Sequence, residues 1–424
     1  MPRLESSGGA AGIIQKLTIF YIVVWSISPP LQIDTIYRLA ALGCAGIWAV
    51  MSLRRGLFVY RIHIYAVMFA VAVAFIAYME KGSFDAILSQ IAIYIMVVCF
   101  VINAFYEENK WQELSVIIPV VMILLIVFNW RTAEILLEDH TIARLLVRDD
   151  AEVYQYMRQG IGGYSLIYPQ VCISPAIFAW TLKAFKHNNL YFAIGCIWAY
   201  TYIICIVRAG YSIAIFASSI GVIILLIYKR KSSMMAVITA FLLFIAGILL
   251  IMYSDGIRGY LLETFDGTAV ADKINDLMGT SENEGANSIE DRMEAYSYSI
   301  KAILQHPFIG TLWMGGGGSH SAILDTIAKY GLWGGYVFIT IIFYVPHYYK
   351  RTFSHSSIVK MSNAVTVTIM FVALLDSFNY SFMPMILIVL PLLFEDILRW
   401  EGIENENSLG GESDSRGAVE KTEY

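Results

Sequence analysis

Charged residues are scarce in this chain of 424 residues. Asp, Glu, Lys and Arg make up only 15% of it, whereas they make up roughly a quarter of an ordinary soluble domain. Hydrophobic residues make up 58%, and a water-soluble fold cannot hide that much apolar surface. The apolar residues also come in long blocks rather than in amphipathic stripes. The composition therefore predicts an integral membrane protein embedded in a lipid bilayer.

The signatures of several enzyme classes are also missing. The five cysteines all fall within apolar blocks, which indicates packing residues rather than a disulfide framework or a zinc site. They are Cys44, Cys99, Cys172, Cys196 and Cys205. No CxxC, HExxH or complete P-loop pattern occurs, so we predict no metal site, no cofactor and no ATP hydrolysis.

The apolar blocks have the length of about 20 residues that a helix needs to cross the hydrocarbon core. We expect twelve spans, at residues 13–29, 36–53, 62–80, 84–105, 111–130, 164–185, 190–207, 209–228, 234–253, 321–345, 358–378 and 381–398. Two neighbouring pairs, 62–80 with 84–105 and 190–207 with 209–228, are expected to form tight hairpins. The predicted fold class is an all-α polytopic membrane protein.

Basic residues in the short loops predict the orientation. One side of the membrane holds eleven of them, and the other side holds only Lys81 and Arg208. The eleven are Arg54, Arg55, Arg61, Lys110, Lys183, Lys186, Lys229, Arg230, Lys231, Lys350 and Arg351. Both termini are therefore predicted to be cytoplasmic, which places the long loops 131–163 and 254–320 outside.

The composition divides the chain into two parts. Residues 1–400 form the predicted transmembrane domain. Residues 401–424 contain seven acidic and two basic residues and have no apolar period. This tail is predicted to be a disordered, solvated cytoplasmic segment.

The first chemically notable motif is Val-Arg208-Ala-Gly210-Tyr, between two predicted spans. An arginine at the bilayer edge commonly anchors a hairpin by snorkelling. The alternative is a guanidinium at the outer interface that forks onto a phosphate, with Gly210 allowing close approach. The residues alone favour the anchor.

The second motif lies in the long outer loop. Residues 289–304 carry apolar or aromatic positions with helical spacing, which predicts an amphipathic helix on the membrane surface, ended by Pro307. Arg292 on this helix has acidic neighbours and has a purely structural alternative as their ion-pair partner. Residues 254–319 hold ten acidic and four basic residues. A generic basic patch, and with it a nucleic-acid partner, is excluded.

The third motif is a run of four glycines, 315–318, followed by Ser319 and His320. Such a backbone can wrap around a ligand, and Ser319 is a good N-cap for the next helix. The free amide groups at a helix start favour an anion. The alternative is a flexible linker into a membrane helix, with Asp325 and Lys329 as an ordinary i,i+4 pair.

The remaining outer loop, 131–163, offers two weaker signals. Asp149 and Asp150 are adjacent acids that could hold a divalent cation, but a solvated loop is the better interpretation. The glycine- and tyrosine-rich segment 160–168 is typical of a re-entry turn with interfacial aromatic residues.

The order of these motifs resembles the O-antigen polymerase and O-antigen ligase family. That family has a short Arg-x-Gly hairpin, here 208–210, and then a long external loop with an arginine, here Arg292. A His/Pro-Phe-x-Gly segment follows, here 306–310. A glycine-rich His-Ser-x-x-Leu segment, here 315–324, then precedes a Gly-Leu helix. The similarity spans roughly residues 200–340, and the segment 160–168 is similar to one in some polymerases.

The resemblance implies a GT-C-like glycosyltransferase in the bacterial inner membrane, whose donor is an undecaprenyl-diphosphate-linked glycan and which needs neither a nucleotide sugar nor a metal. The catalytic positions it implies are Arg208, Arg292 and His320. The substrate-binding positions are Gly210, Gly317, Gly318, Ser319, Ser321 and Tyr296. Ser321 and Tyr296 replace an Asn and a Trp that are frequent in the family. A chain-length regulator and a flippase are the candidate partners.

These roles make chemical sense. Breaking the bond between the sugar and the phosphate leaves a lipid diphosphate with growing negative charge, which two guanidinium groups and a helix N-terminus would stabilise. His320 either takes the proton of the acceptor hydroxyl or hydrogen-bonds the diphosphate. The sequence leaves both roles open.

Three functions remain in competition. The leading hypothesis is a polymerase that moves a growing glycan from its lipid carrier onto a new lipid-linked repeat unit. A ligase that transfers the glycan to a lipid A core or another acceptor would share the same donor chemistry. A flippase or transporter would place its ionisable residues near the bilayer midplane instead of at the ends of spans.

Overall fold

The computed structural model describes helices and short connections, with no strand among the residues it describes. Those residues are 10–53, 61–82, 114–139, 142–146, 151–227, 242, 255–264, 289–312, 314, 318, 320–353, 355–377 and 382–402. The predicted spans 84–105 and 234–253 lie outside them. An all-α architecture is confirmed.

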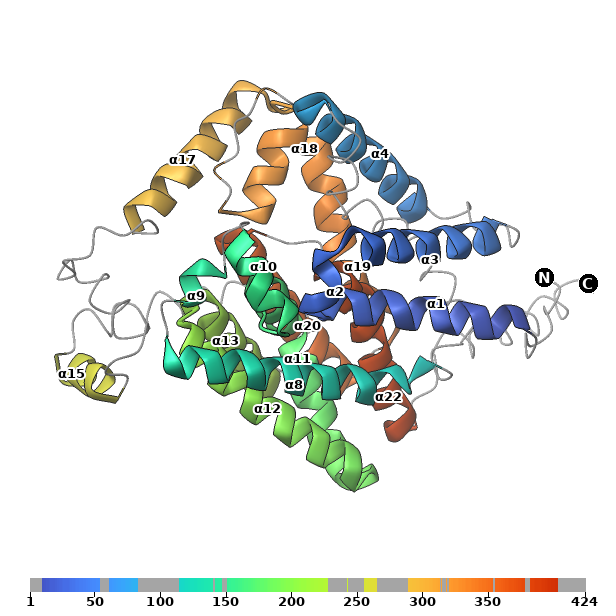
Figure 1. Cartoon of the computed structure of the whole chain (residues 1–424), viewed down its shortest axis with the longest axis vertical. Coiled ribbons are helices and arrows are strands. Elements are labelled where there is room, and N and C mark those ends of the chain that lie inside the picture. The colour runs from blue at the N-terminus through green and yellow to red at the C-terminus, as the bar shows by residue number, and fades with distance from the viewer. Residues whose placement is uncertain are drawn as a thin grey trace, which may run out of the picture.

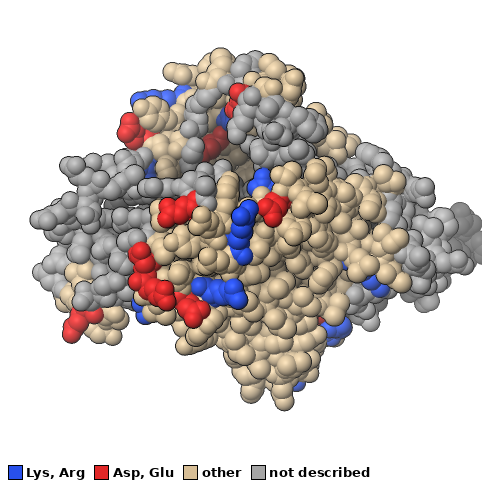
Figure 2. Space-filling model, in the orientation of Figure 1, with Lys and Arg blue, Asp and Glu red and all other residues tan. Residues whose placement is uncertain are grey.

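Four helices are long and apolar enough to cross a membrane, and a bent pair makes a fifth candidate. The four are α8 (Ile117–Glu138), α11 (Tyr164–His187), α12 (Asn189–Ala209) and α20 (Ser356–Leu375). The bent pair is α18 (Ala322–Ile342) and α19 (Tyr344–Thr352), whose axes differ by 55°. In Figure 2 a broad surface without charged side chains occupies the lower middle of the view, between acidic and basic side chains at its left and a few basic side chains at its lower right.

The first four described helices form one side of the molecule. They are α1 (Ala10–Ile27), α2 (Pro29–Ile33), α3 (Thr35–Leu53) and α4 (Arg61–Lys81). α1 and α3 lie side by side in Figure 1, joined by α2, which begins at a Pro-Pro pair suited to a first helical turn. α4 packs against α18.

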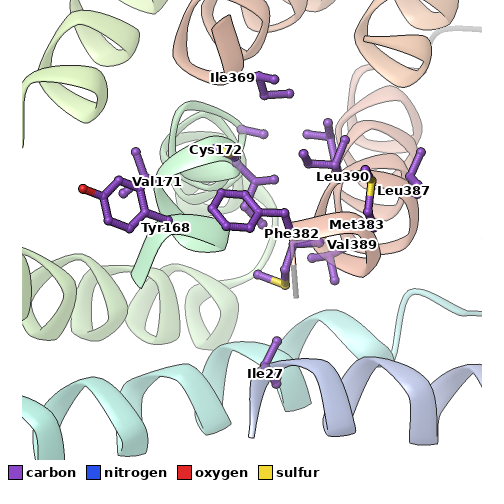
Figure 3. Packing of buried hydrophobic residues seen from close by; sticks show 14 of the residues in the cluster. Ile27, Tyr168, Val171, Cys172, Ile369, Phe382, Met383, Leu387, Val389 and Leu390 are labelled. Atoms are coloured by element: carbon purple, nitrogen blue, oxygen red, sulfur yellow. The ribbon is translucent and has the colours of Figure 1, made fainter. Parts of the chain in front are cut away.

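Helix α11 forms the centre, because it packs against α12, α13 (Ser212–Ile227), α20 and α22 (Leu390–Glu401). Figure 3 shows the rings of Tyr168 in α11 and of Phe382, the first residue of α21 (Phe382–Pro384). Their centroids lie 6.4 Å apart. A buried amide pair joins neighbouring helices: Asn129 of α8 and Gln170 of α11 exchange two hydrogen bonds of 2.9 Å. Trp198 of α12 donates to the same Gln170 oxygen, also at 2.9 Å. Every polar atom of Gln170 is thereby used, as burial requires.

The expected hairpin of 190–207 with 209–228 is a tight turn at Gly210 and Tyr211, but its arms diverge. α12 packs mainly along α8, whereas α13 packs mainly along α20. Gly210 has φ +63°, a left-handed conformation that suits a glycine at a helix end.

The two loops predicted to be external contain helices. They are α9 (Ile142–Leu145), α10 (Ala151–Arg158), α15 (Asp255–Thr264) and α17 (Ile289–Gln305). α17 confirms a helix at 289–304, and it packs against α18. In Figure 1, α15 and α17 lie at the left, while α1 begins at the right. α8 continues to Glu138, so the first residues of the predicted loop 131–163 are helical.

The expected span 321–345 is not a continuous helix. Gly331 has φ +71° and ψ −177°, which interrupts α18. The segment after α17 fills the interruption: Thr311 N donates to Ala328 O at 2.8 Å, and Leu332 N donates to Pro307 O at 2.8 Å. Leu312 N also donates to Lys329 O, at 2.9 Å. The broken helix therefore keeps its backbone groups satisfied, as a membrane protein requires.

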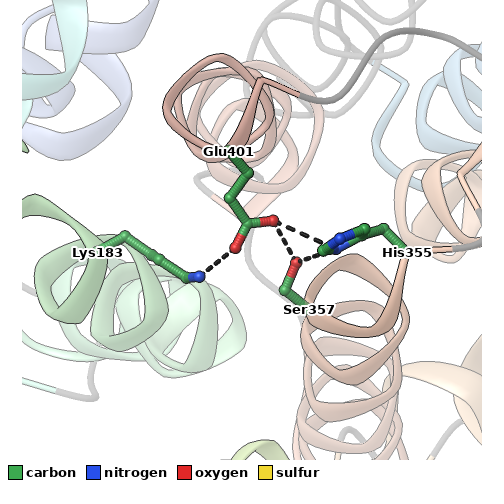
Figure 4. Close-up of polar contacts among 4 residues, drawn as sticks. All are labelled: Lys183, His355, Ser357 and Glu401. Carbon is green, nitrogen blue, oxygen red and sulfur yellow. Dashed lines mark hydrogen bonds and ion pairs between the residues drawn. The ribbon is translucent and has the colours of Figure 1, made fainter.

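The last span begins with α21 (Phe382–Pro384) and a π-helical turn, Met385–Val389, and continues as α22 to Glu401. Glu401, the first residue of the predicted tail, is thus part of a helix. Figure 4 shows its carboxylate between Lys183 of α11, with which it forms an ion pair, and Ser357, whose hydroxyl donates at 2.6 Å. His355 Nδ1 lies 3.4 Å from the same carboxylate. We call these four residues the Glu401 cluster.

Candidate functional site

A buried carboxylate, Asp376, is the centre of the site. It directly follows α20, whose last helical residue is Leu375, and its side chain is 3% exposed. Its Oδ1 accepts a hydrogen bond from Ser377 N at 2.9 Å, and its carbonyl accepts one from Ala322 N at 2.9 Å. No donor among the described residues has hydrogen-bond geometry to Oδ2, although the Tyr168 hydroxyl lies near enough to favour the charged carboxylate.

Electrostatic interactions connect the Asp376 carboxylate to Arg292 of α17 and to His320, which lies two residues before α18 begins. Residues from two separate predicted motifs therefore lie near one buried carboxylate.

Arg292 and Tyr296 reach this carboxylate from α17. They are one helical turn apart and therefore share a face. Arg292 Nη1 donates to Leu375 O at 3.2 Å, and the Tyr296 hydroxyl donates to the same oxygen at 3.1 Å. Burial lowers the pKa of Arg292, but the charge of Asp376 and the nearby tyrosine hydroxyl groups together outweigh it, so the pKa lies above its ordinary value. The expected pairing of Arg292 with its acidic neighbours is not what holds it.

His320 and Ser321 stand at the start of α18. Ser321, and not Ser319 as expected, is the N-cap: its hydroxyl accepts from Leu324 N at 3.2 Å, and the helix begins at Ala322. The Ser321 hydroxyl also donates to Ala373 O of α20 at 3.3 Å. The start of α18 is thereby fixed to the end of α20 beside Asp376.

Gly318, the last of the four glycines, packs directly against α17. A Cβ there would collide with the carbonyl oxygen of Ala295. Its amide donates to the Ser299 hydroxyl at 2.9 Å and to Asp325 Oδ1 at 3.1 Å. The glycine is needed for this close approach. Gly317 and Ser319 fall outside the part of the chain that the structure describes.

Three tyrosines connect the site to the Arg208 motif. The ring of Tyr164, at the start of α11, lies 4.8 Å from Tyr168 and 4.9 Å from Tyr211 between centroids. Tyr164 also lies near Arg292. Tyr211 follows Gly210 directly, so the turn after α12 contacts the same group of rings. Arg208 itself is half-buried in the last turn of α12, three positions before Tyr211.

The structure thus brings together Arg292, Tyr296, His320 and Ser321, and it joins them to the turn at Gly210 through the tyrosines. Arg208 lies near this turn, and no contact with Arg292 connects the two arginines among the described residues. The arrangement places one guanidinium, one imidazole and a helix start around a buried carboxylate. Such a set can bind an anion and can move a proton.

Sequence reasoning missed Asp376, Tyr164 and Tyr168. One signal was present: Asp376 is an acid inside the predicted span 358–378, where an ionisable residue is costly. The rings of Tyr164 and Tyr168 belong to the segment 160–168, which was interpreted as a re-entry turn with interfacial aromatic residues and as similar to a segment in some polymerases. Asp149 and Asp150 are not among the described residues, and no group of three or more His, Cys, Asp or Glu side chains suited to a metal ion occurs within that part of the chain.

Comparisons with known proteins add no family. No protein-family model matches the chain, and no curated protein matches it significantly. The fold and composition define the chain as an all-α protein with apolar helices long enough to span a membrane. A more specific function depends on the geometry of the site.

Proposed function

We propose that this chain is a GT-C-like polysaccharide polymerase with about twelve spans in the bacterial inner membrane. It transfers a growing glycan from undecaprenyl diphosphate to the next lipid-linked repeat unit at the outer face. The observation that carries the proposal is that two separate predicted motifs meet at the end of α20. Arg292 donates to Leu375 O, and the segment directly after His320 donates to Ala373 O and Asp376 O.

The charges suit a lipid diphosphate as the leaving group. The Arg292 guanidinium donates to Leu375 O, which orients its planar fork before a substrate binds. The amide groups at the start of α18 point a positive helix end at the same place. A diphosphate that gains charge as the sugar bond breaks would be stabilised there more than the intact donor.

In the transfer, the acceptor hydroxyl oxygen forms a bond to the anomeric carbon of the donor. The bond between that carbon and the diphosphate oxygen breaks, and its electron pair leaves with undecaprenyl diphosphate. We assign the hydroxyl proton to His320, because the nearby Asp376 carboxylate stabilises the positive charge that the imidazole gains. Asp376 acts through His320 and Arg292 and is a positioning residue.

The surface of α17 suits a lipid-linked substrate. Met293, Leu304 and Phe308 follow one face of the helix and its continuation, and they are 62%, 76% and 77% exposed. Ile300, which is also exposed, lies between them. A continuous exposed apolar stripe is expected where a helix contacts lipid. The opposite face holds Arg292, so one helix presents both a charged site and a lipid-facing surface.

The clustering disfavours a transporter, in which ionisable groups follow a path across the bilayer. A ligase remains the nearest alternative, because it would use the same donor site. The decisive experiment supplies purified protein with synthetic lipid-linked repeat units and separates the products by size. A ladder of lengths supports a polymerase. Transfer only to an added lipid A core identifies a ligase, and absence of any transfer contradicts both.

A further inference from the structure

Asp325, in the first turns of α18, accepts three hydrogen bonds from two different elements. Its Oδ1 accepts from the Ser299 hydroxyl at 2.6 Å and from Gly318 N at 3.1 Å. Its Oδ2 accepts from Ser321 N at 2.9 Å. Both oxygens are therefore used by groups that lie outside the body of α18.

The three donors have a common relation to His320. Gly318 lies two residues before it and Ser321 directly after it, so the carboxylate holds the backbone on both sides of the histidine. The third donor, Ser299, lies on α17 seven residues after Arg292, which is two helical turns along the helix. Asp325 thus ties the segment that carries His320 to the helix that carries Arg292.

Capping alone does not account for these contacts. The Ser321 hydroxyl already caps α18 by accepting from Leu324 N. The expected i,i+4 pair with Lys329 does not form either, because Lys329 Nζ lies 2.7 Å from Glu80 of α4 instead. The carboxylate faces α17 and the glycine segment.

We infer that Asp325 is a positioning residue for the transfer reaction, which sets the place of His320 relative to Arg292. The inference rests on the proposed function. This role requires a side chain that accepts hydrogen bonds at both of its terminal atoms, as a carboxylate does. An amide replaces one of the two oxygens with an NH2 group, which then faces an N–H or O–H donor. Asp325→Asn keeps the volume and removes at least one of the three bonds. The histidine then has a less defined position.

The first test measures transfer rates for Asp325→Asn. We expect kcat to fall by about tenfold to a hundredfold, the effect of misplacing a catalytic group by about 1 Å, while KM for the lipid-linked unit stays within about twofold. In a His320→Ala background, Asp325→Asn should lower the rate no further, because its effect passes through the histidine. Glu294→Gln is the matched control, an acid-to-amide change at an exposed site on α17 that bonds only the exposed Tyr298 hydroxyl. It should leave both constants unchanged.

Equal loss in the wild-type and His320→Ala backgrounds, or a change in KM alone, would overturn the inference. If Asp325→Asn does not reach the membrane, Ser299→Ala carries the test. It removes one donor and should lower kcat by about twofold to tenfold with the same dependence on His320.

A second measurement is independent of catalysis. Diethylpyrocarbonate modifies accessible imidazoles, and mass spectrometry of the peptide that contains His320 gives its reaction rate. The rate should rise several-fold in Asp325→Asn, while that of His347 stays constant. An unchanged His320 rate contradicts the positioning role even if the chain proves not to be a transferase. Absence of transfer by the wild-type protein, with an altered His320 rate in the variant, contradicts only the proposed function.

Discussion

Asp376 combines two properties that rarely occur together, a buried carboxylate and an oxygen without a hydrogen-bond donor of good geometry among the described residues. Such a group destabilises the fold, so its presence indicates a requirement other than stability. The requirement we assign is the orientation of Arg292 and His320. Stability and activity should therefore respond in opposite directions when this side chain is changed.

Asp376→Asn tests this expectation. A buried carboxylate is costly mainly in its charged form, so its cost to stability is small at low pH and is present at pH 7. Asparagine resembles the protonated form at every pH. We expect a higher unfolding temperature than wild type at pH 7, no difference near pH 4, and a loss of transfer of about a hundredfold. Thermal unfolding in detergent at both pH values, with the transfer assay, measures this. A lower unfolding temperature at pH 7 would refute it.

Arg292→Ala and Arg292→Lys form the second test. The guanidinium donates to Leu375 O and has further donors for a substrate. Alanine should lower transfer by about a hundredfold or more, and lysine should restore only part, since a point charge cannot replace a planar fork. Lys301→Ala, on the exposed side of the same helix, is the control and should keep wild-type transfer. Full activity in Arg292→Lys would show that charge alone suffices.

At the scale of residues, the sequence identified candidate side chains but not the residues that they contact. Arg292, Tyr296 and His320 were identified from their order along the chain. Their meeting point, Asp376, lies 56 positions beyond His320, and helical periodicity carries no information about such a distant contact. The N-cap was assigned to Ser319 instead of Ser321 because both are suitable residues and only the tertiary bond from Ser321 to Ala373 O distinguishes them.

At the scale of elements, the interruption of α18 is the feature most dependent on single residues. Gly310 and Gly331 both have positive φ, +77° and +71°, and their backbones are in direct contact. A Cβ at Gly331 would collide with the Phe308 carbonyl oxygen, and one at Gly310 with the Lys329 carbonyl oxygen. The two glycines are therefore required by space as well as by conformation.

Gly331→Ala should lower the free energy of unfolding by about 2 kcal/mol or more, from a strained backbone and a steric clash. Gly46→Ala in α3 is the matched control, because a Cβ there meets nothing within 4 Å and a helical alanine is favoured over glycine. It should be neutral or slightly stabilising. Unfolding in detergent followed by circular dichroism compares the two. Equal stability of both variants would contradict the close backbone contact between Gly310 and Gly331.

The Glu401 cluster makes a prediction about the last helix. Burial raises the pKa of Glu401, but hydrogen bonds from Lys183 and Ser357 outweigh it and leave the pKa below its ordinary value. The stability it contributes is thus present above the unfolded pKa, near 4.3, and is lost as the pH falls through the folded pKa. Glu401→Gln should reduce stability at pH 7 by about 1–3 kcal/mol, with the difference from wild type shrinking below about pH 5.

Lys186→Met serves as the comparison for this cluster, since Lys186 is an exposed base in the last turn of α11, three residues after Lys183. It should unfold like wild type. A pH-independent difference between Glu401→Gln and wild type would show that the ion pair does not cause the effect.

Most helices were predictable because their apolar length is a local property. The expected bounds for α11, α12, α13 and α20 agree with the structure to within a few residues. The break in α18 was not predicted, because Gly331 inside an apolar run is compatible with a helix until another backbone occupies its position. The ion pair at Glu401 joins residues 218 positions apart. The acidic segment that begins at Glu401 has no apolar periodicity, so nothing in its sequence pointed to this contact.

At the scale of the whole molecule, topology is the remaining prediction. With both termini in the cytoplasm, a cysteine at Ser281 should react with a membrane-impermeant maleimide in intact spheroplasts. A cysteine at Lys186 should react only after permeabilisation. The exposed Cys196 should first be replaced by alanine to remove background labelling. Labelling of the two positions in the reverse order would invert the topology and place the site on the cytoplasmic side.

The interlock between residues 307–312 and the break in α18 also has a consequence for biosynthesis. The ribosome makes residues 307–312 before residues 328–332. If residues 307–312 are external, as the predicted topology has them, they must cross the membrane before the second half of α18 can settle. The carbonyl groups freed at Gly331 then find their N–H partners already on the outer side. Membrane insertion of this span is therefore coupled to prior translocation of the loop, and a chain arrested before residue 332 should lack a stably anchored α17.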